Sequence, residues 1–133
     1  MSTFVDTSAL YALLDAGDEN HERASAWFSG PARADGATLM THNYVVVETA
    51  ALVHRRIGAE AVRALLEDLI PVLDVAFVDE PLHRVAASAF LAGARRGPSL
   101  VDWASLEFMR HRGIRLAFAF DRDFERAGFS TVP

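Results

Sequence analysis

Hydrophobic and polar positions alternate along the chain between short β-type runs and longer stretches with helical spacing. Thr3, Phe4 and Val5 form a β-type run, whereas Val46, Ala50 and Val53 recur at the three- to four-residue spacing of a helix. Applied along the whole chain, these two patterns predict strands at 3–5, 38–40, 72–78, 114–120 and 129–132. It predicts helices at 8–14, 43–56, 59–70, 81–95 and 99–112, one more that Asp18 caps, a loop at 30–36, and a short helix opened by Asp121.

This order of elements predicts the fold class. Strands that are separated by helices pair in parallel and are covered by helices on both faces. We therefore expect an α/β protein, a three-layer α/β/α sandwich with a short, mostly parallel central sheet. The 133 residues contain no internal repeat, low-complexity tract or linker, so we expect one domain spanning 1–133.

The composition is that of a globular protein, with 51% hydrophobic and 23% charged residues. No apolar run approaches the roughly 20 residues that a membrane helix needs, and the first residues carry no basic segment typical of a signal peptide. There is no cysteine, which excludes disulfides, thiolate chemistry and cysteine zinc sites. We expect a cytoplasmic protein with no membrane partner.

The basic residues narrow the function classes further, because all 13 are arginine. A chain without lysine has no P-loop and no Schiff-base lysine. The net charge of −5 is unusual for a protein that binds nucleic acid by charge alone. If the protein handles nucleic acid, it does so at a local site, with metal cations supplying positive charge.

Acidic residues mark the predicted site. Asp6 and Asp121 each follow a predicted strand, at the edge of the sheet where α/β folds bind ligands. Glu48 borders the apolar stripe of its helix, and Asp102 lies between apolar neighbours in the first turn of its helix. Asp123 follows two residues after Asp121.

Carboxylates gathered in this way could hold Mg²⁺, and two such ions can promote hydrolysis of a phosphodiester. Without metal they would repel one another, and we expect at least one raised pKa. Each residue also has a simpler explanation. Asp102 completes a capping-box pattern with Ser99, Asp121 can cap its helix, and Glu48 can pair with an arginine.

At these residues the sequence resembles the PIN-domain nucleases. The resemblance rests on FVDTSAL at 4–10, Glu48 in its apolar helix, SLVDWA at 99–104, and FAFDRDF at 118–124 followed by Gly128 and Phe129. It extends from 4 to 129, nearly the whole chain. In size, and in the absence of a further domain, the chain resembles the VapC-type toxins of type II toxin–antitoxin pairs.

The resemblance implies a metal-dependent endoribonuclease that a cognate antitoxin protein keeps silent. It implies that Asp6, Glu48, Asp102 and Asp121 are the catalytic, metal-holding residues for Mg²⁺, with Mn²⁺ as a substitute. Ser8 would be a supporting hydroxyl and Asp123 an accessory acid. It also implies a homodimer. One departure is Ala119, where the family often carries Thr or Ser.

Other functions stay open at this point. A non-catalytic RNA-binding or scaffold module on the same fold would bind RNA with or without metal. A haloacid-dehalogenase-type phosphohydrolase needs an Asp where this chain has Ser8, and a lysine that it lacks. A structure-specific DNA nuclease usually carries additional helices. The sequence does not identify the RNA, since transfer RNA anticodon loops and a ribosomal RNA loop both fit the resemblance.

The remaining polar residues carry weaker signals. We expect His21 and His54 to be exposed. His42 precedes the Glu48 helix, where it could contact the substrate. Arginines near the predicted site are candidate guides for an RNA backbone, although a solvent-exposed face explains any one of them: Arg95, Arg96, Arg110, Arg112, Arg122 and Arg126.

Overall fold

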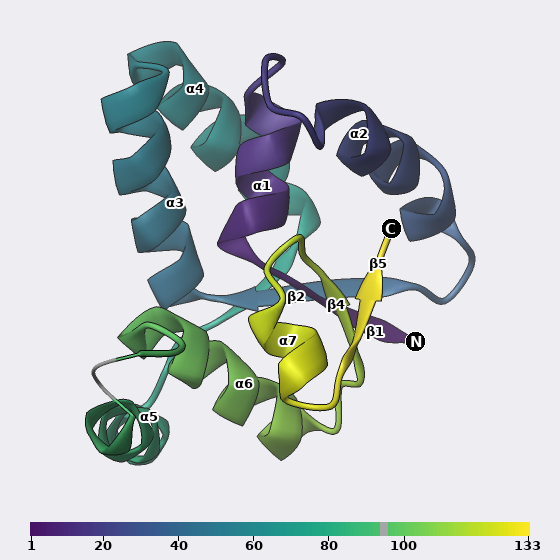
Figure 1. Cartoon of the computed structure of the whole chain (residues 1–133). Coiled ribbons are helices and arrows are strands. Elements are labelled where there is room, and N and C mark those ends of the chain that lie inside the picture. Colours follow the sequence, from purple (N-terminus) through teal and green to yellow (C-terminus); the bar gives the residue numbers. More distant parts are fainter. Residues whose placement is uncertain (94–95) are drawn as a thin grey trace.

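A five-stranded sheet crosses the middle of the molecule in the computed structural model, which describes residues 1–93 and 96–133 (Figure 1). The strand order is β3–β2–β1–β4–β5, and every neighbouring pair is parallel. The strands are β1 (Ser2–Val5), β2 (Thr38–His42), β3 (Asp74–Ala76), β4 (Leu116–Phe118) and β5 (Ser130–Val132).

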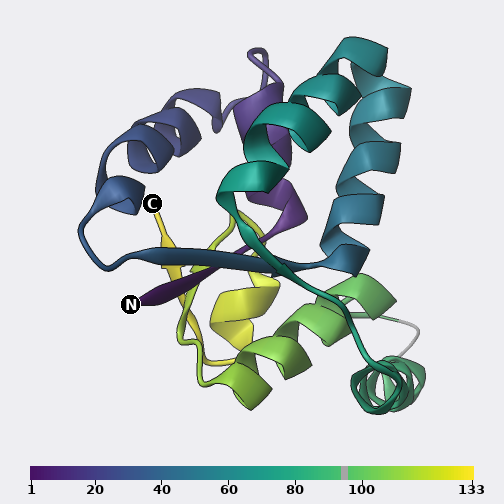
Figure 2. The same cartoon turned by 180° about the vertical axis from the view of Figure 1, so that it is seen from behind.

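Helices cover both faces of this sheet, as the two opposite views show (Figures 1 and 2). One layer holds α1 (Thr7–Leu14), α2 (His21–Ser29), α3 (Asn43–Arg56) and α4 (Ala59–Ala64). The other holds α5 (Glu80–Ala92), α6 (Leu100–Arg112) and α7 (Asp123–Arg126). The predicted three-layer α/β/α sandwich is therefore confirmed, and the described sheet is entirely parallel.

The two central strands place their carboxyl ends side by side. Val5 in β1 pairs with Phe118 in β4, and both side chains are fully buried. The backbone N–H of Asp6 then donates a 3.1 Å hydrogen bond to the Phe118 carbonyl. Because β1 and β4 end at the same level, the residues that follow them emerge at one edge of the sheet.

Two predicted strands are shorter than their apolar runs. The run at 72–78 forms a strand only at Asp74–Ala76, because Pro71 lies in the tight helical turn η3 (Ile70–Val72). The run at 114–120 pairs only at Leu116–Phe118. Outside the paired residues, Leu73, Ile114 and Ala119 are buried in the core, whereas Val72 and Phe77 are exposed.

Three predicted helix boundaries also shift. The helix predicted at 59–70 is α4 followed by a wider helical turn, η2 (Leu65–Leu69). Asp18 does not cap α2, since its carboxylate accepts from the N–H of Asn20 and the helix begins one residue later. The helix predicted to reach residue 95 ends at Ala92, and residues 94–95 lie outside the described residues. The loop predicted at 30–36 contains a short helical turn, η1 (Pro31–Arg33).

Over the described ranges 1–93 and 96–133, no helix combines the length and apolar character needed to cross a bilayer.

Candidate metal centre

A cavity of about 350 Å³ opens at the carboxyl end of the central strands. Its lining includes all four acids on which the sequence argument rests: Asp6, Glu48, Asp102 and Asp121. They come from the end of β1, from α3, from the first turn of α6 and from the segment after β4. Four segments that are distant in the sequence thus deliver one carboxylate each to a common cavity.

Asp6 is the most enclosed of these acids, with 3% of its surface exposed. Its Oδ2 atom accepts a 2.6 Å hydrogen bond from the Ser8 hydroxyl and a 3.1 Å bond from the Ser8 N–H. The same hydroxyl accepts a 2.9 Å bond from the N–H of Phe120. Ser8 therefore connects the acid after β1 to the segment that carries Asp121.

Burial raises the pKa of Asp6 from 3.8 to about 7. The hydrogen bonds from Ser8 oppose this shift, whereas the nearby charges of Asp102 and Asp121 add to it. The expected raised pKa is therefore present, but its first cause is removal of the carboxylate from water rather than repulsion among the acids.

Glu48 lies in the second turn of α3 and is half-buried. Burial raises its pKa, the Thr7 hydroxyl that bonds to it lowers that pKa, and Asp102 and Asp121 raise it again. Thr7 itself accepts a 3.1 Å hydrogen bond from Thr49. Among the described residues, no arginine forms an ion pair with Glu48, so the structure gives no support to its alternative explanation as a paired rim residue.

Asp102 both caps its helix and lines the cavity. It completes a capping box at the start of α6, in which the Ser99 N–H donates to Oδ2 at 3.0 Å and the Asp102 N–H donates to the Ser99 hydroxyl at 3.1 Å. The carboxylate also faces the cavity. Burial raises its pKa, and the charges of Asp121 and Asp123 add to that rise.

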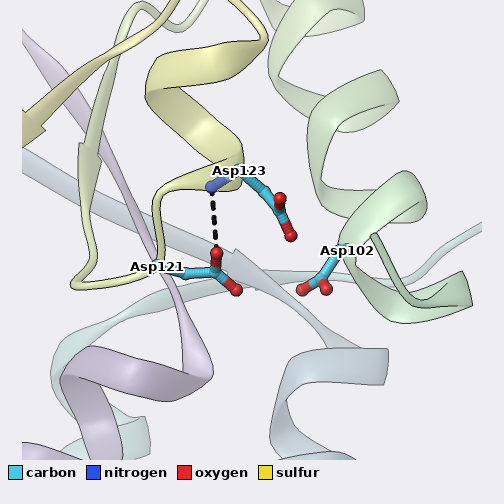
Figure 3. Close-up of side chains that lie close together, drawn as sticks. All are labelled: Asp102, Asp121 and Asp123. Carbon is cyan, nitrogen blue, oxygen red and sulfur yellow. Dashed lines mark hydrogen bonds between the residues drawn. The ribbon is translucent and has the colours of Figure 1, made fainter. Parts of the chain in front are cut away.

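Asp123 belongs to the same cluster of carboxylates. One oxygen each from Asp102, Asp121 and Asp123 lie within 4.8 Å of one another (Figure 3). The Asp123 N–H donates a 2.9 Å hydrogen bond to Asp121. The N-cap residue of α7 is Arg122, with no side-chain cap bond, so the expectation that Asp121 caps this helix is wrong. Burial and the Asp121 charge raise the pKa of Asp123, while Arg126, 3.4 Å away, lowers it.

This donor set suits a hard divalent cation. Mg²⁺ and similar ions prefer carboxylate oxygens, and three carboxylates within a few ångströms can bind one directly or through water. The raised pKa values of Asp6, Glu48, Asp102 and Asp123 mean that the ionised carboxylates are less stable here than in water. A bound cation would stabilise them, so the residues present fit a metal ion.

The cavity also contains residues that the sequence argument did not select. Tyr11 from α1 and Arg56 from α3 line it, together with Asp18 and Asn20 from the connection between α1 and α2. One signal was available, since Arg56 stands eight residues after Glu48 and Leu52 lies midway; all three line the cavity.

None of the five histidines, all of which the structure describes, lines the cavity. His42 is fully buried, with Nε2 2.9 Å from the Ser105 hydroxyl, so it has no approach to substrate. Burial lowers its pKa to about 4. His21 is half-buried rather than exposed, because its Nδ1 lies 2.7 Å from the Ala12 carbonyl. His54 is exposed, as expected.

Among the described arginines that were suggested as RNA guides, none lines the cavity. Arg110 pairs with Glu107, Arg126 pairs with Asp123, and Arg112 lies over the Phe108 ring. Two others, Arg96 and Arg122, are exposed and are not among the lining residues. Arg95 lies outside the described residues.

Comparison with known proteins extends over almost the whole chain. The family model of the PIN domain matches residues 3–130. The chain is 40% identical over 131 residues to a protein of Mycobacterium tuberculosis (strain ATCC 25618 / H37Rv) named "23S rRNA-specific endonuclease VapC20", covering 97% of this chain and 96% of that protein.

Solved structures agree with this match. The crystal structure of M. tuberculosis VapC20, described as a "Sarcin-Ricin loop cleaving toxin", superposes with a TM-score of 0.83 at 39% identity, covering 96% of this chain and 95% of that one. VapBC2 from Rickettsia felis, bound to a promoter DNA fragment, gives a TM-score of 0.72 at 10% identity, over 98% of this chain and 97% of that one. FitAcB from Neisseria gonorrhoeae gives 0.70 at 15%, over 100% and 97%. At such low identity the last two show the shared fold alone.

Proposed function

The chain belongs to the PIN-domain family, and from that premise we propose that it is the toxin of a type II toxin–antitoxin pair, a metal-dependent endoribonuclease. The single observation that carries this proposal is the convergence of four separate segments on one carboxylate-lined cavity. A role as a helix cap or as a surface residue does not explain why each acid lies in the same cavity as the three others.

The proposed catalytic residues are Asp6, Glu48, Asp102 and Asp121, which would hold Mg²⁺, with Mn²⁺ as a substitute. Asp123 would hold the ion together with Asp102 and Asp121, because their oxygens lie within 4.8 Å of one another. When bound, the ion supplies a lowered pKa for an attacking water and a positive charge opposite the phosphate.

The protein's own residues set up this chemistry. Ser8 fixes the Asp6 carboxylate through two hydrogen bonds, and Thr7 bonds to Glu48. The capping box holds Asp102 in place at the start of α6. Such fixed ligands need little rearrangement when the charges of the reaction develop. All these residues belong to a single domain spanning 1–133 in this proposal.

We propose ribosomal RNA as the substrate. The support is the 40% identity, over nearly the full length, to a protein named for cleavage of 23S rRNA. A transfer RNA substrate is the competing outcome, and mapping of the cut ends separates the two. Because such substrates lie in the cytoplasm, the proposal includes a cytoplasmic location.

A cognate antitoxin protein and a homodimer complete the proposal. Co-expression of the chain with the protein encoded beside it, followed by copurification, tests the antitoxin. Light scattering during gel filtration tests the dimer, which would have twice the 14.6 kDa mass of the chain.

The nuclease is tested by incubating the purified protein with ribosomes and with total RNA in Mg²⁺ or Mn²⁺. We expect discrete fragments that disappear in EDTA and with Asp6→Asn, but persist with Asp68→Asn, an exposed carboxylate outside the cavity. Identical patterns from the wild type and Asp6→Asn would identify a contaminating nuclease. RNA binding without cleavage, equal with and without metal, would replace the nuclease by a non-catalytic RNA-binding module.

A further inference from the structure

We infer that Arg56, held against the Tyr11 ring, binds an RNA phosphate beside the bond that is cut; this inference rests on the proposed function. It is drawn from the charge distribution of the cavity, from the position of Arg56 along α3 and from its contacts.

The cavity has an uneven distribution of charge. Five acids line it, and Arg56 is the cation among the lining residues that the structure describes. An RNA strand brings negative charge toward these acids. A metal ion compensates for the phosphate at the acidic end, but the adjoining phosphates need a separate cation.

Along α3, Arg56 lies far enough from Glu48 to contact a different phosphate of the RNA from the one held at the acids. Glu48, Leu52 and Arg56 lie at four-residue intervals, and all three line the cavity. Eight residues of helix extend about 12 Å. This spacing suits contact between Arg56 and a phosphate next to the one held at the acids.

The contacts of Arg56 leave its charge available to a ligand. Its Cζ atom lies 5.6 Å from the centre of the Tyr11 ring, and the Tyr11 hydroxyl donates a 2.8 Å hydrogen bond to Asp15. Asp15 in turn accepts from the Gly17 N–H. No ion pair within 4.0 Å involves Arg56 in the described part of the chain. The charge of Arg56 helps to lower the pKa of Asp15, so Asp15 offsets that charge in part. The Tyr11 ring holds the guanidinium by a cation–π contact, which leaves the arginine charge able to attract a phosphate.

Arg55 provides a matched control. It is the preceding residue, it is exposed, and like Arg56 it lies in the last turn of α3. Replacing either arginine with glutamine removes the same charge from the same helix end, so the effect on the helix dipole is equal. Only Arg56 lines the cavity.

The test uses a labelled RNA hairpin with the sarcin–ricin loop sequence of 23S rRNA. For cleavage in Mg²⁺, we expect Arg56→Gln to raise KM about tenfold and to change kcat less than about twofold, since the contact is present in both substrate and transition state. Arg55→Gln should change neither value more than about twofold. Arg56→Lys should recover most of the loss, because it keeps the charge.

Binding of the same hairpin is measured by fluorescence anisotropy in the Asp6→Asn background, where we expect no cleavage. Adding Arg56→Gln should decrease the slope of log affinity against log salt by about 0.7, the value for one phosphate contact on a single strand. This readout does not depend on the sequence of the RNA or on catalysis.

Equal KM values and equal salt slopes for Arg56→Gln and Arg55→Gln would overturn the inference while leaving the nuclease intact. A wild type that cuts no RNA, but whose binding weakens selectively with Arg56→Gln, would overturn the proposed function and support the phosphate contact. Absence of both cleavage and binding would overturn both. A lowered melting temperature with unchanged binding would assign Arg56 to structure alone.

Discussion

The Ser8 hydroxyl joins two strand ends, because it donates a 2.6 Å hydrogen bond to Asp6 and accepts a 2.9 Å bond from the N–H of Phe120. Asp6 follows β1, and Phe120 precedes Asp121. One small side chain therefore fixes both the orientation of the most buried acid and its distance from the segment carrying another.

Replacing Ser8 with alanine removes both bonds while leaving the helix intact. Because the hydroxyl stabilises the ionised form of Asp6, its loss should raise the pKa of Asp6 further. We expect weaker Mn²⁺ binding by about tenfold and an acidic limb of the rate profile displaced to higher pH. Calorimetry and rates from pH 5.5 to 9 measure these effects. Ser29→Ala, on the exposed end of α2, is the control. A rate profile that superposes on that of the wild type would contradict this role.

The pKa of Asp6 links metal binding to stability. The folded-state pKa of about 7 lies above the ordinary value of 3.8, so ionising this carboxyl costs the folded state more than the unfolded state. Without metal, this group should reduce the free energy of unfolding as pH rises from about 4 to about 7, by roughly 4 kcal/mol in all.

A bound cation reverses that loss, so the stabilisation by Mn²⁺ should be larger at pH 8 than at pH 6. Melting temperatures with EDTA and with Mn²⁺ at both pH values provide the measurement. In metal-free Asp6→Asn, the decrease in stability that Asp6 causes as pH rises should be absent. An equal metal effect at the two pH values in the wild type would contradict the assignment.

His42 is expected to act in the opposite direction. Its pKa is lowered from 6.5 to about 4 by burial, so the neutral form favours folding. Stability from this group is complete above pH 6.5 and is lost as pH falls toward 4, by about 3 kcal/mol. Urea unfolding at a series of pH values measures the loss. His42→Phe should reduce this dependence, and it should preserve kcat at pH 7 if it folds, because the side chain lies outside the cavity.

Most of the fold could be predicted from the sequence because its signals are local. The apolar runs and the periodicity of the long helices identified strands and helices in the right order, and the rule for parallel sheets then gave the layers. The boundaries of β3 and β4 could not be obtained in this way. An apolar run indicates only that a segment tends to be buried. A strand also needs a partner strand at the correct register, which only the assembled sheet supplies.

The site residues also fall into those that the sequence predicts and those that only the folded structure identifies. The sequence located Asp6, Glu48, Asp102 and Asp121 by their unusual positions, and the structure brings them to one cavity. Arg56 and Tyr11 do not stand out by position, because an arginine in the last turn of a helix and a tyrosine on an amphipathic helix are ordinary features. The spacing of Arg56 from Glu48 identifies it only once Glu48 is known to line the cavity. The meeting of Arg56 and Tyr11 depends on how α1 packs against α3, which periodicity does not reveal.

Asp102 allows capping and catalysis to be separated. An asparagine at this position can still accept the bond from the Ser99 N–H, but it carries no charge. Asp102→Asn should therefore reduce cleavage by at least about a hundredfold with little change in melting temperature. Ser99→Ala loses one capping bond and should cost about 1 kcal/mol of stability with a smaller loss of activity. Comparable activity losses in the two variants would mean that Asp102 matters mainly as a cap.

Asp123 is only an accessory acid by the resemblance to PIN-domain nucleases, but the structure places it among the clustered carboxylates. Its carboxylate lies within 4.8 Å of oxygens from Asp102 and Asp121, while its N–H, not its side chain, supports Asp121. Asp123→Asn should therefore preserve the local backbone and weaken Mn²⁺ binding about tenfold, with an activity loss that higher Mn²⁺ concentrations restore. Arg126→Gln removes the neighbouring positive charge, and it should leave metal affinity unchanged or raise it slightly. If Asp123→Asn lost activity that Mn²⁺ did not restore, its carboxylate would have a role other than holding the ion.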